Sequence, residues 1–284
     1  EAAVAVVADP SVHGRVRERA RALAACLGVP LLSNRVPERF DLFLRFTEDR
    51  LELCVSDRVP EIGGGRPIVD DLSAMDTRSG PGRSRRQPRA RAVGLRSVSP
   101  ESLRVVDATA GFGEDAWLLA SFGCRVLAVE RHPVVSALFR DGLRRAAASD
   151  AATASRVVPV TGEADGVLDS LCSSDPACDE TVRAFASPDV VCLDPMFPRK
   201  GRRRCAERKP LRVLRMLVGD DPDGQELLGR ALRAAAQRVV VKRPLRAACL
   251  GGPEAPAPDL QVAGRGFRFD VYLIANVRAR GGAA

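Results

Sequence analysis

The residues with the most distinctive chemistry follow the hydrophobic run Val190–Leu193, where the chain reads DPMFP. The Asp194 carboxylate and a backbone carbonyl of this turn could each accept one hydrogen from an aromatic amino group. The nitrogen lone pair would then point toward an electrophile. The ring of Phe197 could stack on the base that carries the amine, a contact worth about 1–3 kcal/mol. Pro195 stiffens the turn. We therefore predict catalytic roles for Asp194, Pro195 and Phe197.

This turn matches the Asp/Asn-Pro-Pro-Phe/Tyr pattern of enzymes that methylate amino groups, with Met196 in place of the second proline. The alternative is a structural turn in which Asp194 only caps the chain. No Pro-Cys dipeptide occurs, so the pattern favours direct transfer without a covalent intermediate. The amine must reach the methyl donor, so a flipped or single-stranded base is expected.

A second acidic strand end lies upstream, in the stretch VVDATAGFGED at residues 105–115. Gly111 and Gly113 would let the backbone pass close to a ligand, and the following helix offers unpaired N–H groups. The third glycine of a dinucleotide turn is absent, because Ala116 occupies its place. Asp107 would repel a pyrophosphate but could orient the ammonium group of S-adenosylmethionine. The turn therefore favours this cofactor over a dinucleotide, with a purely structural turn as the alternative.

Two later segments extend the predicted cofactor site. Glu130 ends an apolar run nineteen positions after Gly111, where a carboxylate commonly accepts from ribose hydroxyls. An acid after the next strand commonly meets the adenine amino group. Glu163 is the first choice for that contact and Asp165 the second.

The elements that must position these residues alternate between strand and helix. This rhythm, with apolar strands, indicates a doubly wound, mostly parallel sheet whose ligands bind at the carboxyl ends of the strands. The expected strands are Leu103–Val106, Arg125–Val129, Arg156–Val160, Val190–Leu193, Arg238–Lys242, Leu260–Ala263 and Phe267–Ala275. The expected helices between them are Glu114–Phe122, Pro133–Ala148 and Leu227–Ala236.

The first ninety-five residues have a different pattern. They predict a strand at Val4–Val7, a helix at Val12–Leu27 with Ser11 as its N-cap, and a hairpin of Phe40–Phe46 and Leu51–Ser56. We therefore expect a small N-terminal α+β domain over residues 1–95 and a methyltransferase domain over residues 96–284.

Basic residues cluster in places that suit a polyanion. The chain has a formal net charge of +8. The loop Thr77–Arg91 contains no acidic residue and is interpreted as either a solvated linker or an arm that contacts RNA phosphates. A second cluster follows the DPMFP turn, and a third ends the strand near residue 242. The residues that we expect to contact RNA are Arg85, Arg86, Arg199, Lys200, Lys242 and Arg243.

The composition argues against several other classes of protein. The eight cysteines form no CxxC pair and only two histidines are present, so no metal site is expected. No run of about eighteen apolar residues could cross a membrane. The first ten residues lack the layout of a signal peptide and predict a buried strand. A cytoplasmic protein is expected.

Together these segments resemble the small-subunit ribosomal RNA guanine-N2 methyltransferase family called RsmJ, from about Arg91 to Tyr272. The resemblance lies in VVDATAGFGEDAWLLASFGCRV, VERHPVVSALFRDGL, VVCLDPMFP, RVVVKRP and GFRFDVY. It implies a class I, Rossmann-like α/β methyltransferase sheet with a small N-terminal α+β domain. It also implies S-adenosylmethionine as cofactor and, as substrate, a guanine of small-subunit rRNA, either free or in an assembling 30S-type subunit.

The resemblance also implies a set of cofactor contacts. In this chain they fall on Glu114 and Asp115, Glu130 and Arg131, Glu163 and Ala164, and Asp194. The family tends to carry Arg at the position of Glu114, and a Ser-Ser pair at the positions of Glu163 and Ala164. Three rival functions remain at this point: an adenine-N6 methyltransferase, a non-catalytic RNA-binding assembly factor, and an NAD-dependent oxidoreductase.

Overall fold

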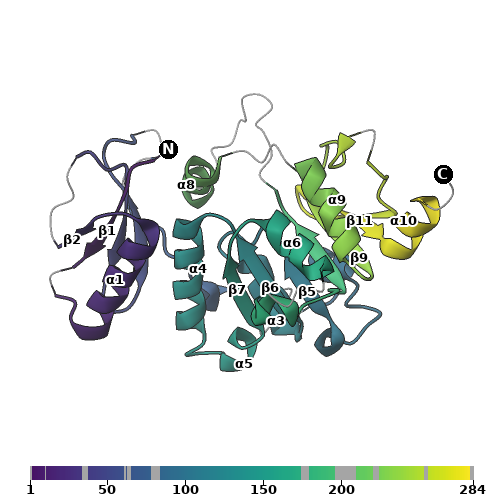
Figure 1. The fold of residues 1–284 in the computed structure, drawn as a ribbon, viewed down its shortest axis with the longest axis horizontal. Helices are drawn as coiled ribbons and strands as arrows, with labels where there is room; N and C mark the ends of the chain where they lie inside the picture. Colours follow the sequence, from purple (N-terminus) through teal and green to yellow (C-terminus); the bar gives the residue numbers. More distant parts are fainter. Residues whose placement is uncertain are drawn as a thin grey trace.

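Two β-sheets form the framework of the chain (Figure 1). The computed structural model describes residues 2–9, 11–33, 38–60, 62, 65–77, 84–173, 179–195, 209–219, 224–252 and 255–281. The larger sheet has seven strands in the order β10-β11-β9-β8-β5-β6-β7, and the smaller has four in the order β2-β1-β3-β4.

The strands of the larger sheet fall close to the ranges expected from the sequence. They are β5 (Arg104–Asp107), β6 (Arg125–Glu130), β7 (Val157–Thr161), β8 (Val190–Leu193), β9 (Arg238–Pro244), β10 (Leu260–Ala263) and β11 (Phe267–Leu273). Only β11 runs antiparallel to its neighbours, and the other pairings are parallel. This arrangement confirms the predicted class I, Rossmann-like fold.

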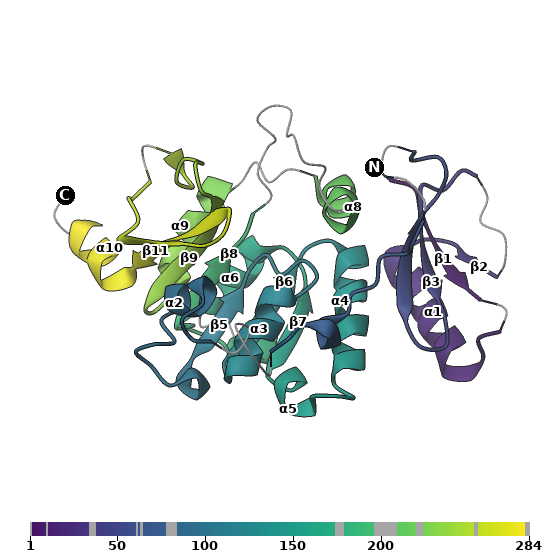
Figure 2. The same cartoon turned by 180° about the vertical axis from the view of Figure 1, so that it is seen from behind.

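Helices connect these strands and cover both faces of the sheet. They are α2 (Pro88–Val93), α3 (Glu114–Phe122), α4 (Pro133–Ala146), α5 (Ala151–Ala154), α6 (Ala164–Cys172), α7 (Glu180–Arg183), α8 (Lys209–Val218), α9 (Gly224–Ala234) and α10 (Ile274–Gly281). Two short 3₁₀ turns, η1 (Leu72–Ala74) and η3 (Pro100–Ser102), precede β5. Figures 1 and 2 show α6 and α9 on one face and α2 and α3 on the other.

Two hydrophobic cores lie on the two faces of the sheet, because side chains alternate along each strand. On β6, Val126 and Ala128 belong to the core under α2, α3 and α4, whereas Leu127 and Val129 belong to the core under α6 and α9. Strands buried on both faces read as continuous apolar runs. This explains why the sequence predicts them well.

The smaller sheet belongs to the N-terminal part of the chain. It contains β1 (Val4–Ala8), β2 (Leu31–Leu32), β3 (Leu42–Phe46) and β4 (Leu51–Val55), with α1 (Gly14–Leu27) packed on it. The antiparallel pairing of β3 with β4 confirms the predicted hairpin. This unit packs against α4 through a core shared with Val134 and Leu138, and it lies at the opposite end of the molecule from the C-terminus (Figure 1).

The structure corrects three details of the prediction. The N-cap position of α1 is His13, which makes no side-chain cap bond, and the Ser11 side chain bonds Asp9. The last strand ends at Leu273, where α10 begins. The expected irregular loop 77–91 contains the start of α2, which Pro88 opens at the first turn.

Helix α2 packs against β9, β10 and β11, although the sequence assigned it to the first domain. The division at residue 95 stays a prediction. In the part of the chain described above, no helix is long and apolar enough to cross a membrane.

Candidate active site

Three acidic strand ends meet at one edge of the larger sheet. Asp107 of β5 is in register with Ala128 of β6 and with Cys192 of β8. Glu130 and Asp194 each lie two residues further along those neighbouring strands. The chain passes from β5 to β6 on one side and returns to β8 on the other, so this edge is the switch point where such sheets bind ligands.

Glu130 fixes the glycine turn to the end of β6. Its buried carboxylate accepts from the N–H of Gly111 at 2.9 Å and from the N–H of His132 at 2.7 Å. The turn is also held by the N–H of Ala110, which donates to the carbonyl of Val129 at 2.9 Å. The glycine turn and the second acidic strand end therefore form one rigid unit.

The two glycines of this turn have different surroundings. Gly111 has a φ of +55°, and a Cβ built on it would meet nothing within 4 Å. Gly113 has a φ of +76°, but a Cβ there would lie 2.0 Å from the ring of Phe139. Gly111 thus leaves open space above the turn, whereas Gly113 is required by packing against α4.

Asp107 is a buried carboxyl group with few hydrogen bonds. Asp107 is 3% exposed, and its Oδ1 accepts a hydrogen bond from the N–H of Thr109 at 3.3 Å. Burial raises the pKa of Asp107 to about 7, and the nearby carboxylate of Asp115 adds to the shift. A cation placed against Asp107 would favour its ionised form.

Asp194 is held from two directions. Its N–H donates to Oγ1 of Thr109 at 2.6 Å, and its Oδ2 accepts from Nζ of Lys242 at 2.5 Å. Nζ of Lys242 also lies 3.8 Å from Oδ2 of Asp115. Burial lowers the pKa of Lys242, but the charges of Asp194 and Asp115 outweigh this effect and leave it raised. Lys242, expected to contact RNA, therefore reaches into the site instead.

Arg89 is the site residue that the sequence analysis missed. It is buried on α2, pairs with the carboxylate of Asp115, and lies over the ring of Phe269 at 4.7 Å from the centroid. In the sequence Arg89 stands out only as one of the basic residues of the stretch 77–91. The signal that could have found it is Pro88 at a helix start followed by Ala90, Ala92 and Val93, which indicates a short buried helix rather than a solvated arm.

The remaining predicted cofactor residues are spread around the rim. Glu163 is exposed at the N-cap of α6, and Ala164 begins that helix. Asp165, the second choice for the adenine contact, pairs with Arg230 of α9 at 3.5 Å. Glu114 is exposed at the start of α3, and Arg131 donates to the carbonyl of Val218 at 3.3 Å.

Three of the predicted RNA contacts lie in different surroundings. Arg243 is 8% exposed, and its guanidinium donates to the carbonyl of Ala248 at 2.9 Å, so it is turned inward. Arg85 and Arg86 are exposed. A hydrogen bond from Ser99 lowers the pKa of Glu101 and the charge of Arg85 lowers it further, which places Arg85 near the amino end of β5, away from the acidic strand ends.

Some predictions fall outside the described residues: the roles of Phe197, Arg199 and Lys200. Pro195 is described and is buried beside Asp194. Within the described ranges, no cluster of three or more His, Cys, Asp or Glu side chains could hold a metal ion.

Comparison with known proteins identifies the class that this fold and site define. The family model described as putative SAM-dependent methyltransferase matches residues 32–274. A SAM-dependent methyltransferase from Neisseria gonorrhoeae has a similar crystal structure, with a TM-score of 0.65 and 29% identity, covering 94% of this chain and 96% of that one. The chain is a SAM-dependent methyltransferase with S-adenosylmethionine as its cofactor.

Curated relatives narrow the class to one family. Ribosomal RNA small subunit methyltransferase J of Thioalkalivibrio sulfidiphilus is 42% identical over 91% of this chain and 94% of its own length. The protein of the same name from Alkalilimnicola ehrlichii is 44% identical over 89% of this chain and 90% of its own length. The chain belongs to the ribosomal RNA small subunit methyltransferase J family.

Proposed function

We propose that the chain transfers the methyl group of S-adenosylmethionine to the exocyclic N2 amine of a guanine in small-subunit ribosomal RNA, in the cytoplasm. The observation that carries this proposal is the position of Asp194. It lies one strand from Asp107, at the edge of the sheet where Glu130 and the glycine turn leave space for a cofactor. The names of the curated relatives supply the substrate class.

The residues at the strand ends fit the cofactor. Bound there, S-adenosylmethionine supplies a methyl group on a positively charged sulfur. Gly111 lets the backbone come close, since no side chain fills the space above it. The buried Asp107 would oppose a cationic group, and the Glu130 carboxylate would accept from ribose hydroxyls. Glu114, Asp115, Arg131, Glu163 and Ala164 are the further contacts that we propose.

Asp194 would orient the amine. A guanine N2 amine is a poor nucleophile because its lone pair is delocalised into the ring. The bond from Thr109 fixes the backbone of Asp194, and Lys242 holds its Oδ2. Oδ1 would then accept one amine hydrogen and turn the lone pair toward the methyl group. In this proposal Pro195 stiffens the turn, and Phe197 stacks on the base.

Substrate phosphates would be bound by basic residues outside this pocket. We propose Arg85, Arg86, Arg199 and Lys200 for these contacts, because exposed guanidinium and ammonium groups neutralise phosphates without reading sequence. Whether the substrate is free rRNA or an assembling subunit is an outcome of the assay below. Arg243 is not in this set, because it is buried and bonds the carbonyl of Ala248.

The test is nucleoside mass spectrometry of rRNA, supplied either free or in partly assembled small subunits, after incubation with the protein and S-adenosylmethionine. We expect N2-methylguanine from the native chain. We expect a loss of about 10²–10³-fold in kcat for Asp194→Ala, because one oriented acceptor is removed. Asp194 is also a proposed cofactor contact, so cofactor affinity is measured separately, and the melting temperature of Asp194→Ala should stay close to that of the native chain. N6-methyladenine as the product, or full activity in Asp194→Ala, would contradict the proposal.

A further inference from the structure

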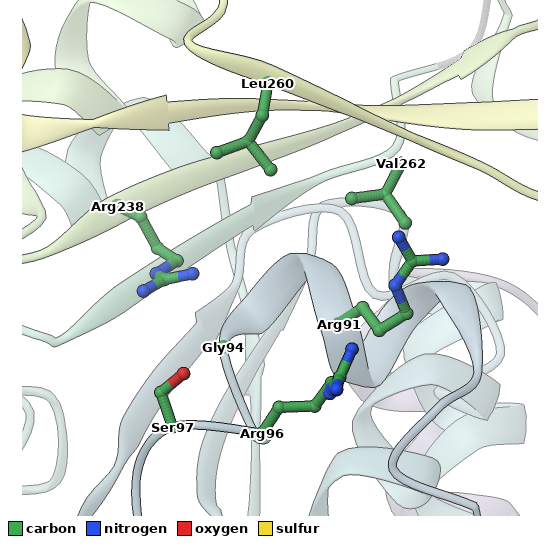
Figure 3. Close-up of a pocket in the computed structure, with 7 residues that line it drawn as sticks. All are labelled: Arg91, Gly94, Arg96, Ser97, Arg238, Leu260 and Val262. Atoms are coloured by element: carbon green, nitrogen blue, oxygen red, sulfur yellow. The ribbon is translucent and has the colours of Figure 1, made fainter.

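A cavity lies on the surface of the molecule, away from the acidic strand ends. It encloses about 330 Å³ between α2, the segment after it, the start of β9 and the edge strand β10 (Figure 3). It is lined by Arg91, Gly94, Arg96, Ser97, Arg238, Leu260 and Val262.

The lining of this cavity is strongly basic. Three guanidinium groups come from three separate segments: Arg91 from α2, Arg96 from the loop after it, and Arg238 from the start of β9. None of the described lining residues is acidic, so the cavity's own wall does not neutralise these charges. The hydroxyl of Ser97 adds a further donor. This set of donors fits an oxyanion.

Arg238 is the most constrained of the three. Its Nη1 donates to the carbonyl of Ala92 at 3.3 Å, but its Nε is enclosed and finds no acceptor within the described part of the chain. Gly94 makes room for it, since a Cβ there would lie 2.7 Å from Cζ of Arg238. Burial lowers the pKa of Arg238, although an arginine keeps its charge. A partly desolvated cation with an unused donor favours an anionic partner.

The cavity is separate from the catalytic edge. Arg238 begins β9 and Lys242 lies four residues further along, which is about 13 Å at the rise of an extended strand. Helix α2 connects the two places. Arg89 and Arg91 are two residues apart and therefore project from nearly opposite sides of the helix, Arg89 toward Asp115 and Arg91 toward the cavity.

We infer that this cavity binds a phosphate of the RNA backbone, at a distance from the base that is methylated. The inference deepens the proposed function and rests on it. Guanidinium groups match phosphate oxygens with paired N–H donors, and such contacts position a nucleic acid without reading its sequence. The apolar side chains of Leu260 and Val262 form the remaining wall, against which a sugar can lie.

The test compares two double variants with equal loss of charge. Arg91→Gln/Arg96→Gln removes the exposed arginines of the cavity and leaves Arg238, whose burial gives it a structural role. Arg15→Gln/Arg21→Gln removes two exposed arginines from α1 as the control. Binding of a small-subunit rRNA fragment is measured by fluorescence anisotropy over a range of salt concentrations. Methylation kinetics give kcat and KM separately.

We expect the cavity variant to raise the Kd for RNA about tenfold and to reduce the slope of log K against log salt by about one. Its KM should rise, with kcat and cofactor affinity unchanged. Wild-type Kd and slope in this variant would overturn the inference, and so would an equal loss in the α1 control. The binding assay does not depend on methylation, so a failure of the proposed methyl transfer can be told apart from a failure of the cavity to bind RNA.

A second arm separates RNA from free phosphate. Inorganic phosphate is titrated against the native chain and the cavity variant, with binding followed by the change in melting temperature. If phosphate protects only the native chain and competes with RNA for it, the inference is supported. If phosphate binds at the cavity but the variant binds RNA as the native chain does, the assignment to the RNA backbone is overturned.

Discussion

At the scale of single residues, the site combines buried acids with two cations, Arg89 and Lys242. The sequence had predicted a basic loop around Arg89 and an RNA contact for Lys242. Asp115 is flanked by Arg89 and Lys242, and Lys242 also holds Asp194. Among the residues that the structure describes, Asp107 forms no ion pair, and burial raises its pKa to about 7. The charge of Asp107 therefore changes near neutral pH, and burial raises the pKa of Asp194 above its ordinary value as well.

Asp107 predicts a pH dependence of cofactor binding. The cationic cofactor favours the carboxylate, so binding lowers the pKa of Asp107 from about 7 and releases a proton. Affinity should be constant above about pH 8 and should fall by up to about tenfold per pH unit below pH 7. Isothermal titration calorimetry measures the affinity for S-adenosylmethionine across this pH range.

The matched variant for this prediction is Asp107→Asn. It has the same size but no titrating group, so its affinity should be weaker and nearly flat over the same pH range. A native chain whose affinity did not change between about pH 6 and 8 would contradict the role given to Asp107.

At the scale of elements, the turn between β5 and α3 uses two glycines for two different reasons. Both adopt positive φ, which costs other residues about 1–2 kcal/mol. Only Gly113 also lies against Phe139 of α4. In this Gly-Phe-Gly segment, Gly111 therefore allows a ligand to approach the backbone, and Gly113 allows α4 to pack closely.

Alanine substitutions should separate these two roles. Gly113→Ala forces a Cβ into the ring of Phe139, and overpacking together with backbone strain should lower the free energy of unfolding by about 2–4 kcal/mol. Gly111→Ala should lower it by only about 1 kcal/mol but weaken cofactor affinity more than tenfold, since its Cβ enters the space left for the ligand. Urea unfolding and calorimetry measure both. Equal losses of stability would show that the packing argument is wrong.

At the scale of the whole molecule, α4 joins the N-terminal unit to the larger sheet. Its Asp141 is buried, accepts from the N–H of Leu51 at 2.9 Å, and pairs with Arg19 of α1 at 2.8 Å. Arg144 and Arg145 of the same helix also bond this carboxylate. Burial raises the pKa of Asp141, but these bonds outweigh it and hold the pKa below its ordinary value.

Removing this carboxylate should loosen the attachment of the N-terminal unit. Asp141→Ala leaves the buried N–H of Leu51 and three partly exposed guanidinium groups without this acceptor, and should cost about 2–3 kcal/mol in the free energy of unfolding. The control is Asp169→Ala on α6, whose half-exposed carboxylate pairs with Arg230 and Arg233 and should contribute less than about 1 kcal/mol. Chemical denaturation compares the two. A similar small loss in both variants would contradict the joining role of Asp141.

The sequence by itself determined the larger sheet and its acidic strand ends. Apolar runs of four to six residues that end in Asp107, Glu130 and Asp194 are local signals, because strand periodicity and the carboxyl end of a strand are fixed by neighbouring residues. Parallel pairing then brings such ends to one edge of the sheet. This is why the fold class and the position of the site could be predicted together.

Only the tertiary structure decided which charges face those acids. Arg89 is 26 positions from Asp115, and Lys242 is 48 positions from Asp194, so their pairing depends on how α2 and β9 pack and not on any local pattern. The same holds for Asp141 and Leu51, which are 90 positions apart. A contact between distant segments has no period or spacing in the sequence, because the energy that selects it comes from burial in the assembled core.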